Sequence, residues 1–289
     1  MTSSNGSVVD RYLRRINIEP DGRSAAELAR LVTAAMATVP YETIWIHSGQ
    51  SWSTDPALAL ARIARDSRGG YCFQLNGALA LVLEHLGYHV QRHVGGVYSG
   101  DESPERAMTN HLVLTVADMP ADDNPAGRWY VDTGLGDGPT RPLALLDQVV
   151  GDGAYCYGLR ATTDGVGEWT LTHDPKGSFG AMTFSLAPAE TTAFDDRHTI
   201  LSTSPDSGFV KVVTAQIKVP EQATILRGCL LTKVRSSGSV VSVHERRTDW
   251  FEMLDAEFGL TLIDLDGSSL DRLWERVAQA HEAWKRSQP

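Results

Sequence analysis

Residues 68–76, RGGYCFQLN, place a cysteine directly after two glycines and at the start of an apolar run. Gly69 and Gly70 allow backbone angles that a side chain would forbid, so the chain can turn sharply before Cys72. Apolar residues then recur at helical spacing and end at a glycine: Leu75, Leu79, Val82, Leu86 and Gly87. This pattern predicts a helix that begins near Cys72 and stops at Gly87.

A cysteine in the first turn of a helix is suited to nucleophilic chemistry. The unpaired N–H groups and the positive end of the helix dipole favour a thiolate, and thiolate is the attacking species. The same N–H groups can stabilise an oxyanion. A lone cysteine is more often a small buried hydrophobic residue. We interpret Cys156 and Cys229 in that way, because neither follows a glycine turn at a helix start.

A cysteine nucleophile needs a base, and the base needs an orienting partner. His111 opens the strand-like run HLVLTV, and Asp132 lies near the end of the run RWYVDT, before a glycine-rich turn. The order Cys72, His111, Asp132 along the chain is the one used by papain-like and transglutaminase-like folds. From spacing alone, a structural histidine and a strand-end cap remain the alternatives. The pattern supports a triad as a hypothesis.

The chain divides into three zones of different character. Residues 1–88 read as a helical bundle that carries the nucleophile, and residues 89–195 as short strands that carry His111 and Asp132. Residues 196–289 mix strands, expected at 209–219 and 239–243, with amphipathic helices. This order favours an α+β fold over a doubly wound parallel sheet.

Composition restricts the class of protein. The chain has 289 residues, of which 42% are hydrophobic, enough for a sizeable core. A net charge of -10 argues against a nucleic-acid partner, and the absence of a long apolar run argues against a membrane span. Three cysteines do not form a disulfide framework, and residues 1–10 do not resemble a secretory signal. We therefore expect a cytoplasmic protein. We expect no metal, because Gly87 interrupts the histidines at 85, 89 and 93.

Several segments together resemble the arylamine N-acetyltransferase family, over nearly the whole chain. The RGGYCFQLN segment resembles the family's nucleophile motif and is the most specific. NHLVLTV at 110–116 and VDTGLGDG at 131–138 resemble the segments that bear its histidine and aspartate. The others are DRYLRRINIE at 10–19, VPYETI at 39–44, STSPDSGFVKVVTAQ at 202–216 and ERRTDWFEMLDAEFGLTL at 245–262. Several motifs in the right order carry more weight than any one of them.

The resemblance implies a helical bundle, a central β-barrel and an α/β lid, with a catalytic core like that of cysteine proteases and transglutaminases. It implies acetyl-CoA as acyl donor, ping-pong transfer through an acyl-cysteine, and an arylamine or hydrazine as acceptor. Cys72, His111 and Asp132 then take the catalytic roles. The implied cofactor contacts are Asn110, Gly134, Gly136, Gly138 and Phe209. Arg68 and Glu42 occupy the positions of a structural arginine and glutamate, and we expect the two to pair.

Two departures from the family pattern bear on substrate choice. Leu135 replaces a phenylalanine in the acceptor wall, and Asp137 places a carboxylate beside the implied pyrophosphate site. We expect the carboxylate to repel phosphate unless a cation such as Arg141 compensates. An amide synthase of the same family, acting on a carrier-bound acyl chain, is therefore the first alternative. A cysteine hydrolase or transglutaminase-like enzyme and a binding protein without turnover are the others. The sequence leaves open the acceptor amine, the acyl donor and a homodimer.

Overall fold

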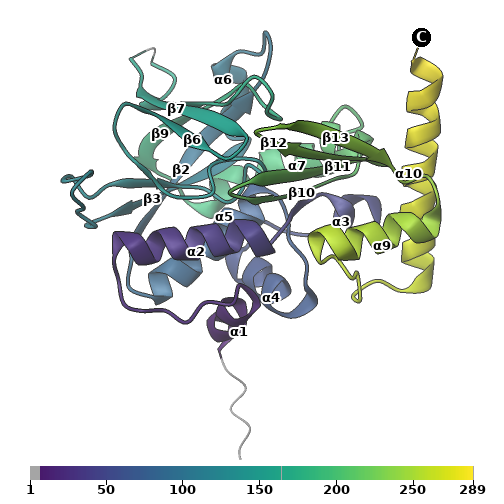
Figure 1. Ribbon diagram of the computed structural model, residues 1–289, viewed down its shortest axis with the longest axis horizontal. Coiled ribbons are helices and arrows are strands. Elements are labelled where there is room, and N and C mark those ends of the chain that lie inside the picture. The colour runs from purple at the N-terminus through teal and green to yellow at the C-terminus, as the bar shows by residue number, and fades with distance from the viewer. Residues whose placement is uncertain (1–6, 164, 289) are drawn as a thin grey trace, which may run out of the picture.

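The computed structural model describes residues 7–163 and 165–288. Residues 1–6, which belong to the N-terminal stretch that does not resemble a secretory signal, lie outside the described residues. Helices and two antiparallel sheets occupy largely separate stretches of chain, which confirms the predicted α+β class. Figure 1 shows the N-terminal helices beneath the two sheets and α10 (Gly267–Ser287) standing at one side. Among the described residues, no helix combines the length and apolar character needed to cross a bilayer.

The N-terminal part of the chain is helical, and the helix predicted from Cys72 begins at that residue. The helices here are α1 (Val8–Arg15), α2 (Ala25–Thr38), α3 (Ile44–His47), α4 (Pro56–Asp66) and α5 (Cys72–His85). The Ser24 hydroxyl accepts a hydrogen bond from the backbone N–H of Glu27 and so caps α2. The Asp55 carboxylate caps α4, which has proline at its first position. After α5, Gly87 adopts a φ of 83°, which stops the helix.

The larger sheet has the strand order β5-β4-β3-β2-β9-β8-β7-β6. Its strands are β2 (His89–Tyr98), β3 (His111–Ala117), β4 (Trp129–Val131), β5 (Leu143–Ala144), β6 (Gln148–Asp152), β7 (Tyr155–Ala161), β8 (Trp169–Thr172) and β9 (Ala181–Pro188), with α6 (Pro104–Ala107) between β2 and β3. Within the described residues, β5 and β6 stand at the two ends and do not pair with each other. Where the sequence predicts a barrel, the structure therefore has a curled, open sheet.

The smaller sheet joins the two ends of the chain. Its order is β1 (Tyr41–Glu42), β10 (Thr214–Val219), β11 (Gln222–Arg227), β12 (Leu230–Arg235) and β13 (Gly238–Val243). Its flanking elements are η1 (Thr191–Phe194), α7 (Asp195–Thr203), α8 (Gly208–Lys211) and α9 (Arg247–Phe258). The strand predicted over 209–219 begins only at Thr214, because Ser207 caps the short helix α8 before it. The division into parts at residues 88 and 195 stays a prediction, since β1 pairs with a C-terminal strand.

Helix α5 lies at the centre of the fold. Every residue from Cys72 to Ala80 is buried, so the helix is covered on all sides over its first turns. One hydrophobic cluster joins it to the other N-terminal helices and to β3, through Leu112, Leu114 and Val116. Full burial explains why α5 lacks the polar stripe of a surface helix. It also fixes the position of Cys72 relative to the larger sheet.

A buried charge network ties the segment before α5 to the rest of the molecule. The Arg68 guanidinium has no exposed surface and lies 3.0 Å from a carboxylate oxygen of Glu42, so the predicted pair is present. It also donates to Asp264 at 2.8 Å and to the Gln50 side chain at 3.2 Å. The Arg68 side chain therefore links its own segment to the segments that carry Glu42, Gln50 and Asp264.

We predict that Arg68→Leu lowers the free energy of unfolding by about 3–5 kcal/mol, because it leaves the Glu42 carboxylate buried without its partner. Urea denaturation measures the change. Asp271→Ala is the control, since Asp271 pairs with Arg247 at an exposed site and should cost no more than about 1 kcal/mol. Equal losses in the two variants would contradict the structural role of Arg68.

Candidate active site

Cys72 is the first residue of α5 and is only 3% exposed. The two preceding glycines are required by close contacts. A Cβ at Gly69 would lie 1.7 Å from the carbonyl oxygen of Pro40, and Gly70 has a φ of 152°. The Cys72 thiol donates to the carbonyl oxygen of Asn110 at 3.5 Å, which brings the sulfur to the start of β3.

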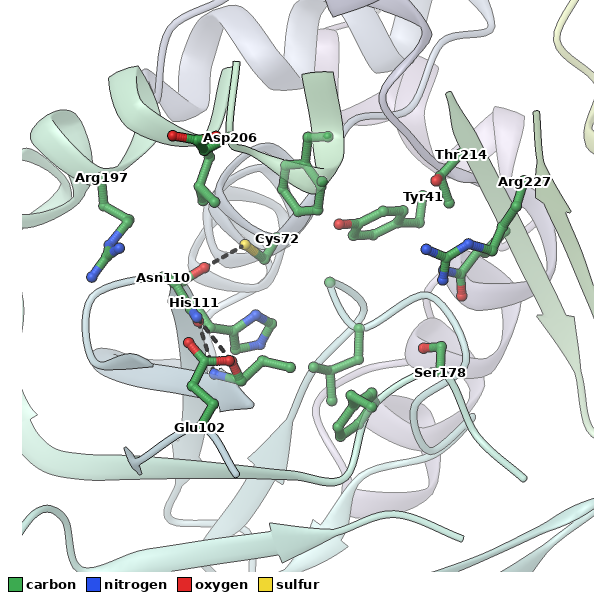
Figure 2. Close-up of a pocket in the computed structure, with 18 residues that line it drawn as sticks. Tyr41, Cys72, Glu102, Asn110, His111, Ser178, Arg197, Asp206, Thr214 and Arg227 are labelled. Carbon is green, nitrogen blue, oxygen red and sulfur yellow. Dashed lines mark hydrogen bonds between the residues drawn. The ribbon is translucent and has the colours of Figure 1, made fainter. Parts of the chain in front are cut away.

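His111 and Asp132 form a buried pair beside the sulfur. His111 Nε2 lies 2.6 Å from Asp132 Oδ2, and both side chains are almost wholly buried. Figure 2 shows His111 beside Cys72, and both side chains line the same cavity. Burial alone would lower the pKa of His111, but the charges of Asp132 and Cys72 and the hydrogen bonds to them raise it to about 10. The structure thus brings the three predicted residues together, in an arrangement that favours an imidazolium next to the sulfur of Cys72.

The Asp132 carboxylate is held on both oxygens. Oδ2 accepts a hydrogen bond from the Tyr130 hydroxyl at 2.9 Å, in addition to its contact with His111. Oδ1 accepts from Asn76 Nδ2 at 2.8 Å and from the Gly134 N–H at 2.7 Å. These donors stabilise the ionised carboxylate and fix its direction toward the imidazole.

Asn76 is a site residue that the sequence interpretation overlooked. Its Nδ2 donates to Asp132 and, at 2.6 Å, to the carbonyl oxygen of Leu112, and its Oδ1 accepts from the Thr133 N–H at 2.8 Å. A signal was present, because Asn76 follows Cys72 by four residues and so shares its helix face. Asn76 connects the nucleophile's helix directly to the strand that carries the aspartate.

A cavity of about 540 Å³ opens at the sulfur of Cys72 (Figure 2). Its lining residues are Tyr41, Cys72, Val97, Glu102, Asn110, His111, Gly134, Leu135, Ser178, Phe179, Arg197, Leu201, Asp206, Gly208, Phe209, Thr214, Gln216 and Arg227. Of the residues implied as cofactor contacts, Asn110, Gly134 and Phe209 are in this lining and Gly136 and Gly138 are not. Its volume is that of a typical small-molecule site.

Three of the residues implied as cofactor contacts, Asn110, Gly136 and Gly138, are in close contact with other residues of the protein. The Asn110 side chain bonds both the N–H and the carbonyl of Val97, at 2.8 and 2.9 Å, so its amide is already occupied. A Cβ at Gly136 would lie 2.4 Å from the Gln216 side chain, and a Cβ at Gly138 2.9 Å from Leu135. The glycines therefore let the loop after Asp132 pack closely.

The expectation that the Asp137 carboxylate lies free beside the implied pyrophosphate site and repels phosphate is wrong. Its carboxylate is fully buried and accepts hydrogen bonds from the Ser178 hydroxyl at 2.7 Å and the Ser178 N–H at 2.8 Å. His173 Nε2 lies 3.3 Å from the same carboxylate. Arg141 is exposed on a different part of the surface and does not compensate it. Asp137 thus joins two walls of the cavity, those of Leu135 and of Ser178, and presents no free charge to it.

Two arginines in the cavity lining were not predicted. Arg197 comes from α7 and Arg227 from the end of β11, and Figure 2 shows them on opposite sides of Cys72. Neither lies in a motif that distinguishes it from the other basic residues of the chain. Only the tertiary arrangement brings them to the nucleophile.

The remaining cysteines differ from Cys72 in their surroundings. Cys156 is exposed on β7, so its interpretation as a small buried residue is wrong. Cys229 is buried, and burial raises the pKa of its thiol to about 11. Within the described residues, no three His, Cys, Asp or Glu side chains gather where they could hold a metal ion.

Known proteins similar to this chain in sequence or in structure are N-acetyltransferases. The sequence profile of a family described as N-acetyltransferase matches residues 24–266. The arylamine N-acetyltransferase of Mycolicibacterium smegmatis is 33% identical over 279 residues, covering 93% of this chain and 96% of that protein. Arylamine N-acetyltransferase 1 of Bos taurus is 26% identical, covering 78% and 82%. The Mycobacterium marinum arylamine N-acetyltransferase, solved in complex with CoA, superposes with a TM-score of 0.82 at 27% identity, covering 94% of this chain and 99% of that one.

We predict that His111→Gln slows alkylation of Cys72 by iodoacetamide about tenfold or more near neutral pH, because the imidazolium no longer stabilises the thiolate. With the pKa of His111 near 10, the wild-type ring stays charged at neutral pH and loses its proton as pH rises toward 10. The measurement uses a Cys156→Ser background, which removes the exposed thiol. An unchanged rate in the His111 variant would refute the pair.

We also predict that Gly134→Ala slows the same alkylation, because its Cβ would lie 2.6 Å from the Cα of Cys72 and must displace the helix or the loop. Gly151→Ala is the matched control, since the space around that position is open. The rate in the control should equal that of the parent. A rate in Gly134→Ala equal to that of the control would contradict the close packing described above.

Proposed function

The chain belongs to the arylamine N-acetyltransferase family, and on this premise we propose that it moves an acetyl group from acetyl-CoA to the nitrogen of an arylamine or hydrazine. The observation that carries the proposal is the buried contact of Cys72, at a helix start, with an imidazole held by Asp132. In a family of acyltransferases, that contact supports Cys72 as nucleophile, His111 as base and Asp132 as the orienting group. The relative from M. marinum was solved with CoA, which supports CoA thioesters as donors.

The first half-reaction loads the enzyme. The Cys72 thiolate attacks the thioester carbonyl of acetyl-CoA, and a new carbon–sulfur bond forms. N–H groups in the first turn of α5, next to the sulfur, can donate to the oxyanion that forms. The intermediate collapses with loss of the CoA thiolate, which takes the proton that His111 carries. The product is an acetyl thioester on Cys72, with His111 neutral.

The second half-reaction unloads it. The free electron pair of an amine attacks the acetyl carbon, and His111 accepts the proton from the attacking nitrogen. Cys72 leaves as a thiolate beside the new imidazolium, which regenerates the resting pair. Aromatic amines suit this step because their weak basicity leaves them neutral near pH 7, with the electron pair available.

The cavity supports a shared site for donor and acceptor. Gly134 and Phe209 line it next to the sulfur, so we keep both as proposed contacts of the acyl group or the acceptor. For Asn110, Gly136 and Gly138 the internal contacts support a different role, the shaping of the cavity wall. The helix-borne cysteine and strand-borne histidine also support a core of the cysteine-protease and transglutaminase type.

The hypothesis of a carrier-dependent amide synthase rests on Asp137 and Leu135, and the argument from Asp137 no longer supports it. The expected repulsion between the Asp137 carboxylate and a pyrophosphate does not apply, because that carboxylate is buried and hydrogen-bonded to Ser178. Leu135 does line the cavity, in keeping with a reshaped acceptor wall. A reshaped wall changes which amine fits and leaves the donor chemistry untouched. Acetyl transfer is therefore the better-supported function.

We predict that incubation with acetyl-CoA adds the mass of one acetyl group to the wild-type chain and none to Cys72→Ala. Intact-mass spectrometry reads the adduct, and subsequent addition of aromatic amines should remove it and yield the N-acetyl product. Cys156→Ser is the control and should be loaded like the wild type. An adduct that persists in Cys72→Ala would refute the nucleophile. Loss of the adduct in water without an amine would favour the hydrolase.

A further inference from the structure

Strand β13 forms an exposed border of the smaller sheet. Among the described residues it pairs on one side only, with β12. All six of its residues are exposed, and its three valines, Val240, Val241 and Val243, are 71%, 56% and 54% exposed. Figure 1 shows β13 at the upper border of this sheet, with α10 beyond one end. The strand therefore presents apolar side chains and an unpaired edge at the same place.

The backbone of β13 offers hydrogen bonds on its outer side. The N–H of His244, directly after the strand, donates to the carbonyl oxygen of Cys229 at 2.8 Å, so the backbone of residue 244 points toward β12. Backbone groups alternate in direction along an antiparallel strand. The N–H and C=O groups of Ser239, Val241 and Val243 therefore point away from β12, where the described part of the chain places no other strand.

None of the usual devices protects this edge. Edge strands of soluble proteins commonly carry a lysine, a proline, an inward charge or a bulge that prevents pairing with another chain. The sequence of β13 is GSVVSV, without a charged residue or a proline. Its register with β12 runs from Gly238 to Val243 without a shift, so no bulge interrupts it. Such an edge is suited to pair with a further strand.

The strand is complementary to a second copy of itself. In an antiparallel pair with a twofold axis at Val241, the outward groups of Ser239, Val241 and Val243 meet those of the partner's Val243, Val241 and Ser239. Each of these three residue pairs can exchange two backbone hydrogen bonds. Val241 and Val243 lie two apart and share a face, so the valines of both copies form one apolar cluster.

The two ends of β13 differ in charge, which favours the antiparallel arrangement. The exposed Arg235, just before the turn into β13, bonds the neutral side chain of Gln222. Glu245, just after β13, is half exposed. Antiparallel pairing brings the turn beside Arg235 to the end of the partner strand that is followed by Glu245. The other basic side chains near the strand have acidic partners within the chain: Lys233, Arg246 and Arg247.

An exposed tryptophan extends the contact beyond the strand. The Glu245 carboxylate accepts hydrogen bonds from His281 at 2.8 Å and from Lys285 at 3.1 Å, so the last turns of α10 lie near the end of β13. The Trp284 ring is 43% exposed and stacks on His281, with ring centroids 5.4 Å apart. In the paired arrangement it lies at the partner's β12–β13 turn. Tryptophan is enriched in the contacts between proteins, and it adds area that one pair of strands lacks.

We propose that β13 is a dimer interface, at which two copies of this chain pair antiparallel about Val241 and join their smaller sheets into one. A second copy is the favoured partner because the neutral strand and its oppositely charged ends complement themselves. The proposal is independent of acetyl transfer, since no residue of β13 lines the cavity at Cys72. Through β12 and β11 the joined sheet extends to Arg227 in the wall of each cavity.

Sedimentation velocity of the full-length protein over a range of concentrations tests the dimer. The wild type should approach the mass of two chains as its concentration rises. Val241→Lys should weaken association about tenfold or more, because it replaces two buried valines by two ammonium groups that meet at the axis. Val149→Lys is the matched control, since it places the same charge on a 66% exposed valine of β6, the edge of the larger sheet. It should associate like the wild type, and thermal unfolding checks that both variants are folded.

Disulfide trapping tests the register in a Cys156→Ser background, which removes the exposed thiol. At the axis, the two copies of residue 241 form a hydrogen-bonded pair with Cα atoms about 5.5 Å apart, a separation that a disulfide can span. Val241→Cys should therefore cross-link on oxidation. Val243→Cys is the control, because its partner across the interface is Ser239, and the two copies of residue 243 lie too far apart to join.

Three results overturn the proposal. A wild type that keeps the mass of one chain at every concentration excludes the dimer. Loss of association in Val149→Lys but not in Val241→Lys assigns the interface to β6. Equal cross-linking of Val241→Cys and Val243→Cys, or none in either, excludes the twofold pairing at Val241.

Discussion

The site depends on the hydrogen bonds that converge on the carboxylate of Asp132. That one group receives His111 from β3, Asn76 from α5, Tyr130 from its own strand and the N–H of Gly134 from the loop that follows. A helix and a sheet are thereby held in a single relative position at the point where the sulfur meets the imidazole. Since a misplacement of about 1 Å can cost much of a catalytic rate, this convergence is as important to the chemistry as the three reacting side chains.

The loop after Asp132 is the second rigid element, and its support is polar and buried. Lys218 donates to the carbonyl oxygen of Gly138 and to Asp152, both at 2.9 Å, although burial lowers the pKa of its ammonium. Asp137 binds Ser178 from the opposite wall. A low-dielectric surrounding strengthens these bonds and makes any unpaired member costly. The cavity walls are therefore fixed before a ligand enters.

Local sequence predicted what depends on neighbouring residues. The glycine pair and the apolar spacing located the start of α5, and the ends of two strands located His111 and Asp132. What depends on distant pairing was not predicted. The environment of Asp137 depends on His173 and Ser178, which are 36 and 41 residues away. The barrel was found to be an open sheet because its closure depends on pairing of the two outermost strands, which no local pattern encodes. The position of Arg227 at the site depends on the register of β10 with β11, which the sequence did not predict.

The pairing of β1 with β10 has a consequence for how the protein matures on the ribosome. Cys72, His111 and Asp132 are all synthesised before residue 133, whereas the cavity-lining residues Thr214, Gln216 and Arg227 follow only beyond residue 213. Joining Tyr41 to Gln216 closes a very long loop, and contacts of high sequence separation form late in folding. A nascent chain can thus bring Cys72, His111 and Asp132 together before the cavity for substrates is complete. Premature chemistry at that stage is limited only by the burial that the helices and β3 already provide.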